Sequence, residues 1–360
     1  MPALAEELAR IPLVQDVAQQ RKRLAALLAR VVVLLLLFTS VDRMAAGFLV
    51  RGLKRSYGLD VPSQVLCIGH SHTALGIDRI ALEQQLGVPV SKYARNGANI
   101  ADRLSMIKHY LEEQPTSVKV VVYDVDAHTF TGKGLSLNSY TLFYPFMDSP
   151  SVDAYVRQHA CYSEYWLRRV LQLPRFDLET CNASLRGWLG VSTNLKRGKV
   201  DSDRLKKEIA TGAIRRISFD EESLASFEET LRFVSGKGIY IVLLYIPTID
   251  LYNEAEPEQF ERAVQLLQYY STIYDGIAFL NYNPVFSHRH ELFYDCMHLN
   301  PQGQKLVTEK LAHDLKSILI EWSRHASGYA KDRAHVKELA GAPPGTCQIF
   351  ARSRRRVVCY

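Results

Sequence analysis

Apolar residues along the chain follow two patterns that alternate. Short, nearly continuous apolar runs rich in β-branched residues predict buried strands, and longer stretches with apolar residues three or four positions apart predict helices. The predicted strands lie within residues 63–71, 88–97, 117–126, 239–247 and 277–283. The predicted helices lie within residues 77–87, 99–114, 221–238, 257–276 and 300–323.

Strands that alternate with helices indicate an α/β fold in which helices cover both faces of a sheet. Residues 117–126, SVKVVVYDVD, are apolar at consecutive positions, as is typical of a central parallel strand that is buried on both faces. We therefore predict a doubly wound, mainly parallel sheet. Its closing helix should have Asn300 as its cap and Pro301 at its first position.

The alternation is interrupted between about residues 131 and 218. This stretch is rich in aromatic residues and includes a helical pattern at residues 151–173, SVDAYVRQHACYSEYWLRRVLQL. We interpret it as a helical insertion that covers the functional site or meets a partner.

Residues 24–41, LAALLARVVVLLLLFTSV, contain a single charged residue, Arg30. A helix of this length measures about 27 Å at about 1.5 Å per residue, close to the hydrocarbon core of a bilayer at about 30 Å. We predict one transmembrane helix rather than a cleaved signal peptide, because a long stretch precedes it and no small-residue cleavage site follows it.

The predicted helix divides the chain. We expect residues 1–23 to be a cytoplasmic segment, 42–63 a connector, 64–324 the folded domain and 325–360 a flexible basic tail. Lys and Arg residues nearly balance on the two sides of the helix, and we place the amino terminus in the cytoplasm. The chain would then be a single-pass inner-membrane protein whose domain lies in an extracytoplasmic space, the periplasm in a bacterium.

The formal net charge of +6 comes from residues near the two ends of the chain, at 21–23, 51–55 and 352–356. A surplus that flanks the domain does not indicate a nucleic-acid partner, which calls for interleaved aromatic residues or a recognisable module. The six cysteines fit an oxidising compartment and include no CxxC metal spacing. The pairs near enough in sequence to form disulfides are Cys161 with Cys181 and Cys347 with Cys359.

Reactive side chains follow two of the predicted strands and precede the last helix. Because the carboxyl ends of parallel strands meet at one edge of a sheet, we expect these side chains to converge. They are Ser71, Asp124, Asp126, His128, Asp295 and His298. A serine hydroxyl becomes a good nucleophile when a base takes its proton and a carboxylate orients that base. His298 and Asp295 can supply these two groups.

Three stretches resemble conserved blocks of the SGNH (GDSL-like) hydrolase superfamily. They are CIGHSHTALGID at residues 67–78, ARNGANIADRL at 94–104 and DCMHLNPQGQ at 295–304. The sequence resembles in particular the membrane-anchored branch that includes alginate O-acetylation proteins and the D-alanyl transfer proteins of teichoic acid synthesis. The resemblance implies a flavodoxin-like SGNH fold with Ser71 as nucleophile, His298 as base and Asp295 as orienting acid.

The resemblance also implies an oxyanion hole, with the backbone amides of Ser71 and Gly97 as donors. The third block of the family usually carries Gly-x-Asn-Asp, whose asparagine is a further donor, but here the strand ends YDVDAHTF. Asn96 or Asn99 are candidates to replace that donor. The residues expected to bind the oxyanion or the substrate are therefore Gly97, Asn96, Asn99, Asp126 and His128.

The resemblance implies a membrane-anchored, extracytoplasmic serine esterase or O-acyltransferase that acts on acyl groups of a cell-envelope polysaccharide. Its ligand would be an acylated glycan or an acyl donor, and a membrane-bound O-acyltransferase would be a partner. We expect no cofactor, no metal ion and no nucleic acid. Two alternatives stay open. One is a non-catalytic SGNH-like protein that binds glycan or assembles a complex. The other is a metal-dependent hydrolase with ligands among His70, His72, Asp126, His128, Asp295 and His298.

Overall fold

A five-stranded sheet lies at the centre of the described residues, which in this computed structural model are 12–132 and 139–340. The strands are β1 (Val65–Gly69), β2 (Val90–Ala94), β3 (Val120–Val125), β4 (Tyr240–Tyr245) and β5 (Ile277–Asn281). Neighbouring strands are parallel and their order is β2-β1-β3-β4-β5. Each strand lies within a predicted apolar run, and the predicted parallel α/β fold is confirmed.

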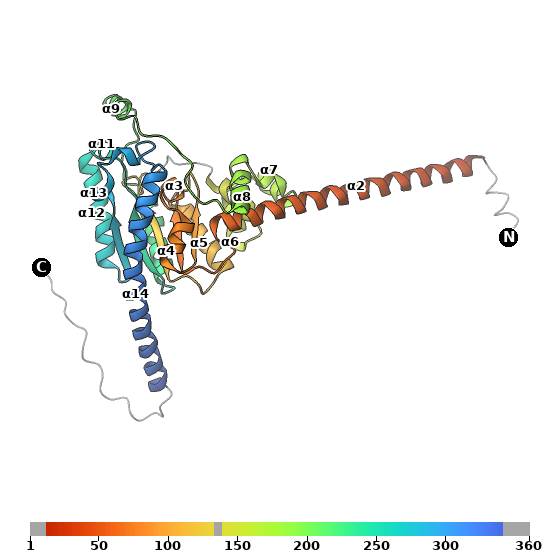
Figure 1. The fold of residues 1–360 in the computed structure, drawn as a ribbon. Helices are drawn as coiled ribbons and strands as arrows, with labels where there is room; N and C mark the ends of the chain where they lie inside the picture. Colours follow the sequence, from red (N-terminus) through yellow and green to blue (C-terminus); the bar gives the residue numbers. More distant parts are fainter. Residues whose placement is uncertain (1–11, 133–138, 341–360) are drawn as a thin grey trace.

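Helices cover both faces of this sheet (Figure 1). One core forms between the sheet and the helices α5 (Ile100–Glu113), α10 (Glu221–Ser235) and α12 (Pro257–Ile273). The second core forms against α4 (Arg79–Leu86) and α14 (Pro301–Ala340). Alternate residues of β1 enter the two cores, Leu66 and Ile68 the first, Val65 and Cys67 the second. This burial on both faces explains why the strands are apolar at consecutive positions.

Short elements lie in the loops that follow the strands. They are α3 (Ser71–Gly76), α11 (Asp250–Asn253), α13 (Asn283–Phe286) and the 3-10 turn η3 (His290–Leu292). The predicted start of the last helix is confirmed, because Oδ1 of Asn300 accepts the N–H groups of Gln302 at 3.0 Å and Gly303 at 3.1 Å.

Helix α2 (Pro12–Tyr57) extends beyond the predicted span at both ends. The expected connector is helical as far as Tyr57 because it packs along α8 (Leu178–Leu189), where two glycines let the helices approach closely. A Cβ atom on Gly187 would overlap the carbonyl oxygen of Gly52.

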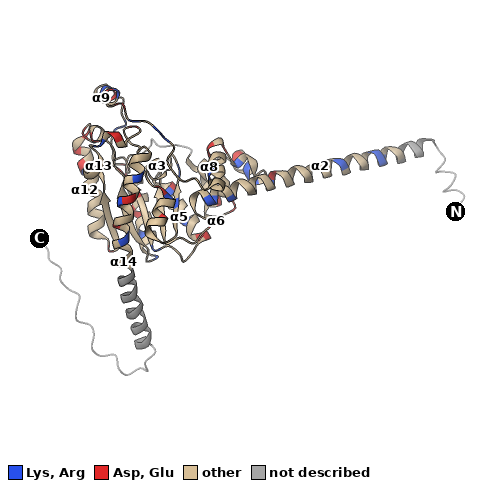
Figure 2. Cartoon of the chain, viewed as in Figure 1, with Lys and Arg blue, Asp and Glu red and all other residues tan. Residues whose placement is uncertain are grey.

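Within the described residues, one helical stretch, Gln19–Tyr57, is long and apolar enough to cross a membrane. Its most apolar window has a mean hydropathy of 2.5 and makes no buried contact with the domain. Figure 2 shows an uncharged ribbon between the basic bands of α2 and the domain. Length and composition of this kind are shared by membrane spans and signal sequences.

The described residues of the interval at 131–218, which exclude 133–138, lie mainly in helices. These helices are η1 (Ser139–Phe146), α6 (Pro150–His159), α7 (Tyr162–Val170), η2 (Leu173–Arg175), α8 and α9 (Ser202–Ala210). At the other end of the domain, α14 continues past the expected boundary at residue 324 as far as Ala340. Between Gly303 and Ala340 the sequence contains one glycine, Gly328, and no proline, which suits a long helix. Residues 341–360 of the expected tail lie outside the described residues.

Four cysteines in the described residues are free thiols, Cys67, Cys161, Cys181 and Cys296. The considered disulfide between Cys161 and Cys181 is not formed, since the first caps α7 and the second lies within α8. Burial raises the pKa of both Cys67 and Cys296 to about 12, so these thiols near the site stay protonated. Cys347 and Cys359 lie outside the described residues.

Candidate active site

Ser71 is the first residue of α3 and follows β1 almost directly. His70 caps this helix, because its Nδ1 accepts the N–H of His72 at 3.1 Å. Gly69 is required at the end of β1, since a Cβ atom there would lie 2.5 Å from the Cβ of Asp124 on β3. This tight turn presents Ser71 at the carboxyl edge of the sheet, where ligands bind in open α/β folds.

Ser71, His298 and Asp295 form a hydrogen-bonded line. Nε2 of His298 lies 2.7 Å from Oγ of Ser71. Nδ1 of the same ring lies 2.9 Å from Oδ2 and 3.0 Å from Oδ1 of Asp295. The side chains of His298 and Asp295 are 22% and 42% exposed. The structure thus brings these three predicted residues together in a place that solvent reaches.

The hydrogen bonds indicate which nitrogen of His298 carries the proton. Burial raises the pKa of Asp295. A hydrogen bond from the ring of His298, the electrostatic interaction with that ring, and hydrogen bonds from the N–H groups of Met297 and His298 together lower this pKa below its ordinary value. An ionised carboxylate only accepts hydrogen bonds, so Nδ1 of His298 donates to Asp295. Nε2 then accepts the hydroxyl proton of Ser71, as a general base must.

The loop ahead of α14 holds the histidine in place. Oδ1 of Asp295 accepts the N–H of His298 at 2.8 Å, and the N–H of Tyr294 donates to the carbonyl of His298 at 2.7 Å. Nδ2 of Asn300 donates to the carbonyl of Glu291 at 2.7 Å. The D-x-x-H segment therefore forms a turn, which Asp295 closes by accepting the N–H of His298.

The loop after β2 lies beside the nucleophile turn, because the N–H of Arg95 donates to the carbonyl of Gly69 at 3.2 Å. In this loop Gly97 has a φ of 79°, a left-handed conformation that favours glycine. Within the part of the chain that the structure describes, the N–H groups of Ser71 and Gly97 have no hydrogen-bond partner. Both are free to bind a substrate oxygen.

The two asparagines considered as oxyanion donors have other partners. Nδ2 of Asn96 donates to Oε1 of Glu179 at 3.0 Å. Asn99 caps α5, where its Oδ1 accepts the N–H of Asp102 at 2.9 Å. Nδ2 of Asn99 donates to Oγ of Ser139 at 3.0 Å. An oxyanion role would require either amide to leave its partner, and it stays a prediction for both.

A second group of histidines and carboxylates is buried behind Ser71. Oδ2 of Asp126 lies 3.2 Å from Nε2 of His70 and 3.4 Å from Nδ1 of His72. Burial above all lowers the pKa of His72 well below its ordinary value, so this ring is neutral. Although burial raises the pKa of Asp126, the hydrogen bond from His70 and the neighbouring histidines lower it well below its ordinary value. The group supports the turn from inside, and substrate binding by Asp126 stays a prediction.

Asp124 and Arg103 fasten the turn to the sheet. Oδ2 of Asp124 accepts the N–H groups of His70 at 3.4 Å and Thr73 at 3.3 Å. Nη1 of the buried Arg103 donates to the carbonyl of Asp124 at 2.5 Å. The sequence pattern did not single out Arg103. The signal that could have done so is a charged residue on the apolar side of the helix at 99–114.

His128 is buried with its ring 5.4 Å from that of Tyr252, and its predicted substrate contact stays untested. The residues considered as metal ligands do not all meet. His70 and His72, together with Asp124, each place one ligand atom within 4.8 Å of the others. This buried trio is the group in the described ranges that could hold a metal ion.

A second Ser–His–Asp line lies at the start of α9, and the sequence did not predict it. Oγ of Ser202 lies 3.3 Å from Nδ1 of His290, whose Nε2 lies 2.6 Å from Oδ1 of Asp250. Oδ2 of Asp250 also contacts Nδ1 of His288 at 2.6 Å. In Figure 1, α9 projects at the edge of the domain.

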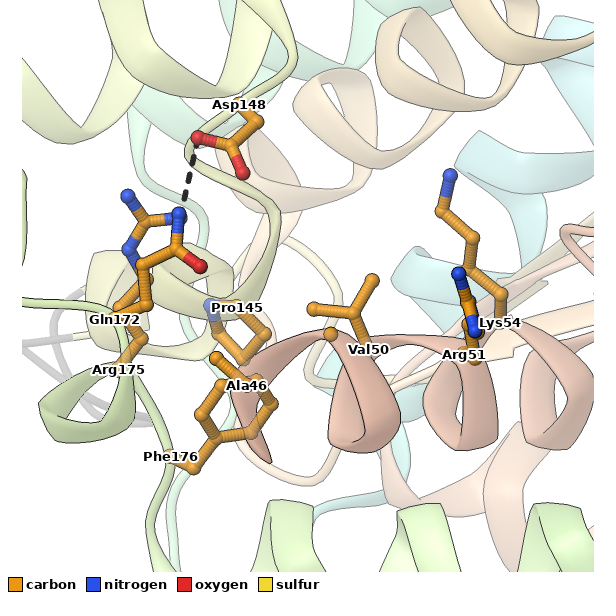
Figure 3. Close-up of a pocket in the computed structure, with 10 residues that line it drawn as sticks. Ala46, Val50, Arg51, Lys54, Pro145, Asp148, Gln172, Arg175 and Phe176 are labelled. Atoms are coloured by element: carbon orange, nitrogen blue, oxygen red, sulfur yellow. Dashed lines mark ion pairs between the residues drawn. The ribbon is translucent and has the colours of Figure 1, made fainter. Parts of the chain in front are cut away.

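A pocket of about 280 Å³ lies at the base of α2 (Figure 3). Ala46 and Val50 of α2 and Phe176 form part of its apolar wall, and Arg175 and Asp148 form an ion pair of 3.2 Å beside it. Its lining includes none of the three residues of the Ser71 line. The Ser71, His298 and Asp295 side chains and this pocket therefore lie in different parts of the structure.

Comparisons with known proteins find distant structural likeness. No family model matches the sequence, and no curated protein matches it. A proposed acylhydrolase from Bacteroides fragilis is 12% identical with a TM-score of 0.36, over 71% of this chain and 86% of that one. A proposed platelet activating factor from Streptococcus pneumonia is 12% identical with a TM-score of 0.35, over 80% of this chain and 99% of that one. An acetyl xylan esterase from the rumen bacterium Butyrivibrio proteoclasticus is 10% identical with a TM-score of 0.31, over 72% of this chain and 64% of that one. Likenesses this distant identify neither a family nor an activity.

Proposed function

We propose that the chain is a membrane-anchored serine esterase or O-acyltransferase of the SGNH type, with Ser71 as nucleophile, His298 as base and Asp295 as orienting acid. The observation that carries this proposal is the 2.7 Å contact between Oγ of Ser71 and Nε2 of His298, whose Nδ1 is bonded to Asp295. A serine with these two partners is the activated nucleophile of acyl transfer.

The reaction would proceed in two displacements. Oγ of Ser71 attacks the acyl carbonyl carbon while Nε2 of His298 takes the hydroxyl proton. The tetrahedral intermediate collapses, the ester oxygen leaves with the proton from Nε2, and an acyl-enzyme remains. Water or a sugar hydroxyl then gives its proton to Nε2 and attacks the same carbon. When this intermediate collapses, Oγ of Ser71 leaves and takes the proton from Nε2, which restores the serine hydroxyl and the neutral histidine. Water completes an esterase cycle, and a sugar hydroxyl completes an acyltransferase cycle.

The free N–H groups of Ser71 and Gly97 are the proposed oxyanion donors. Preorganised donors act on the charge that develops in the transition state, and one donor commonly accounts for about 10² to 10³ in rate. Asp295 keeps Nδ1 of His298 protonated and stabilises the imidazolium that forms after the first proton transfer.

The proposed substrate is an acyl ester carried by a cell-envelope polysaccharide, with a membrane-bound O-acyltransferase as the partner that supplies the acyl group. The support is the sequence resemblance, together with an apolar helix that has the length of a bilayer span. The site would then work outside the cytoplasm, next to the membrane.

A serine-directed fluorophosphonate probe tests the nucleophile in the full-length protein. We expect labelling of the wild type, loss of labelling in Ser71→Ala, and unchanged labelling in Ser202→Ala. The second variant is a matched control, because Ser202 also contacts a histidine that is bonded to an aspartate. An unlabelled wild type would favour the non-catalytic alternative. If the wild type is labelled, mass spectrometry compares the ester content of envelope glycans from cells with wild-type Ser71 and with Ser71→Ala. A lower ester content in the variant would indicate an acyltransferase, and a higher one an esterase.

A metal-dependent hydrolase is the second candidate, favoured by the proximity of His70, His72 and Asp124. These residues are buried, and Nδ1 of His70 already accepts the N–H of His72. Ester cleavage that is lost in chelator but retained in Ser71→Ala would establish this candidate in place of the serine mechanism.

A further inference from the structure

The domain meets α2 at a defined residue. Residues 19–41 of this helix are exposed throughout, and Asp42 is the first buried residue, with 3% exposure. Both carboxylate oxygens of Asp42 accept backbone N–H groups, Oδ2 from Gln172 and Oδ1 from Leu173, each at 2.8 Å. The segment that joins α7 to η2 is thus fastened to α2 one residue after the apolar run ends.

The hydrogen bonds of Asp42 with Gln172 and Leu173 fix the position of the end of α7 along the membrane normal. If α2 spans the membrane, as proposed above, its 18-residue apolar stretch ends at Val41 and fills about 27 Å of the roughly 30 Å hydrocarbon core. Asp42 then lies at the boundary between hydrocarbon and headgroups. Gln172 and Leu173 must lie at the same boundary.

Helix α7 exposes an apolar face beside this boundary. Tyr162, Trp166 and Val170 recur every fourth residue and are 80%, 43% and 62% exposed, and Leu167 beside them is 50% exposed. The opposite side of the helix is anchored in the domain, where the hydroxyl of the buried Tyr165 donates to Asp153 at 2.9 Å. Figure 1 shows α7 close to the point where α2 leaves the domain. We call the residues 162, 166, 167 and 170 the α7 face.

The composition of the α7 face matches the headgroup layer. Tyrosine and tryptophan collect at membrane interfaces because their rings are apolar and their polar atoms reach water. Arg168 and Arg169 on the same helix already pair with carboxylates of the domain. The exposed Arg43 follows Asp42 on α2, and a cation at this height suits the phosphates of anionic lipids.

We propose that the α7 face lies in the lipid headgroup layer, so that the domain is docked on the bilayer as well as tethered by α2. The inference rests on the proposed membrane span. It adds a second contact with the membrane, and two contacts restrict the orientation of the domain in a way that one helix does not. The active site would then face the envelope from a fixed position.

Quenching of tryptophan emission by brominated lipids tests this docking. The chain has three tryptophans, Trp166, Trp188 and Trp322. The full-length protein with Trp188→Phe and Trp322→Phe retains only Trp166, and it is reconstituted in vesicles of neutral and anionic phospholipids brominated near the headgroup end of the acyl chains. We expect the emission of Trp166 to fall relative to unbrominated vesicles.

Two further variants make the result decisive. With Trp166→Phe and Trp188→Phe, only Trp322 on α14 remains, beside Lys119 ahead of β3, and we expect no quenching. With all three tryptophans replaced by Phe, Phe38→Trp places an indole within the apolar part of α2, and we expect the strongest quenching with bromines deeper in the acyl chains. An unquenched indole at position 38 would refute the membrane span itself. Quenching at position 38 without quenching of Trp166 would leave the span intact and refute the docking, and the α7 face would then be available to a protein partner.

Discussion

The two Ser–His–Asp lines in this chain contain the same residue types in different surroundings. The Ser71 line has an oxygen–nitrogen distance of 2.7 Å, whereas the Ser202 line has one of 3.3 Å. The histidines also use opposite atoms, since His298 faces its serine through Nε2 and His290 through Nδ1. Proximity of the three residue types alone therefore does not distinguish an active site.

The surroundings of the two serines differ more than their distances. Ser71 follows a central strand at the carboxyl edge of the sheet, and the N–H groups of Ser71 and Gly97 are unpaired within the described residues. Asp295 serves a single histidine, but Asp250 is shared between His290 and His288. What singles out Ser71 is a fixed turn with donors beside it, which the fold supplies at the strand end.

The largest expected effect separates the two aspartates. We predict that Asp295→Asn lowers kcat by about 10⁴-fold, because an amide no longer holds His298 in the tautomer that accepts the serine proton. Asp250→Asn is the matched change in the other line and should leave kcat within about 2-fold. Cleavage of a chromogenic acyl ester by the two full-length variants measures both values. Equal losses would mean that the second line takes part in the reaction.

The strands and the convergence of Ser71 with His298 and Asp295 were predictable from the sequence, because they depend on local apolar patterns and on the order of the elements. The apolar runs specified the strands, and the order of strands and helices placed Ser71 and the D-x-x-H turn at one edge. The Ser202 line was not predictable, since residues 202, 250 and 290 begin three separate helical elements, α9, α11 and η3, whose relative positions no periodic pattern fixes. The partner of Arg103 was not predictable, because it is the backbone carbonyl of Asp124, which no side-chain pattern identifies.

The second prediction concerns the buried group of His70, His72 and Asp126 next to Ser71. Asp126→Asn should lower the free energy of unfolding by about 3 kcal/mol, because a buried carboxylate that accepts hydrogen bonds from His70 and Thr129 is replaced by an amide with a misplaced donor. Asp250→Asn should cost less than about 1 kcal/mol, because its partners His288 and His290 are 71% and 35% exposed. Urea unfolding of the detergent-solubilised full-length chain, followed by circular dichroism, compares them. Similar losses would show that burial around Asp126 does not stabilise the turn.

The smallest expected effect concerns the missing asparagine of the oxyanion hole. Nδ2 of Asn96 donates to Glu179, so Asn96→Ala should change kcat by less than about 3-fold, whereas loss of a true oxyanion donor costs about 10² to 10³. The same ester assay measures this variant, with Glu179→Gln as the control that leaves Asn96 in place. A 100-fold loss in Asn96→Ala, on the scale of a lost donor, would mean that this amide leaves Glu179 when substrate binds. A small loss would exclude Asn96 as an oxyanion donor and would leave the N–H groups of Ser71 and Gly97 and the side chain of Asn99 as the candidates.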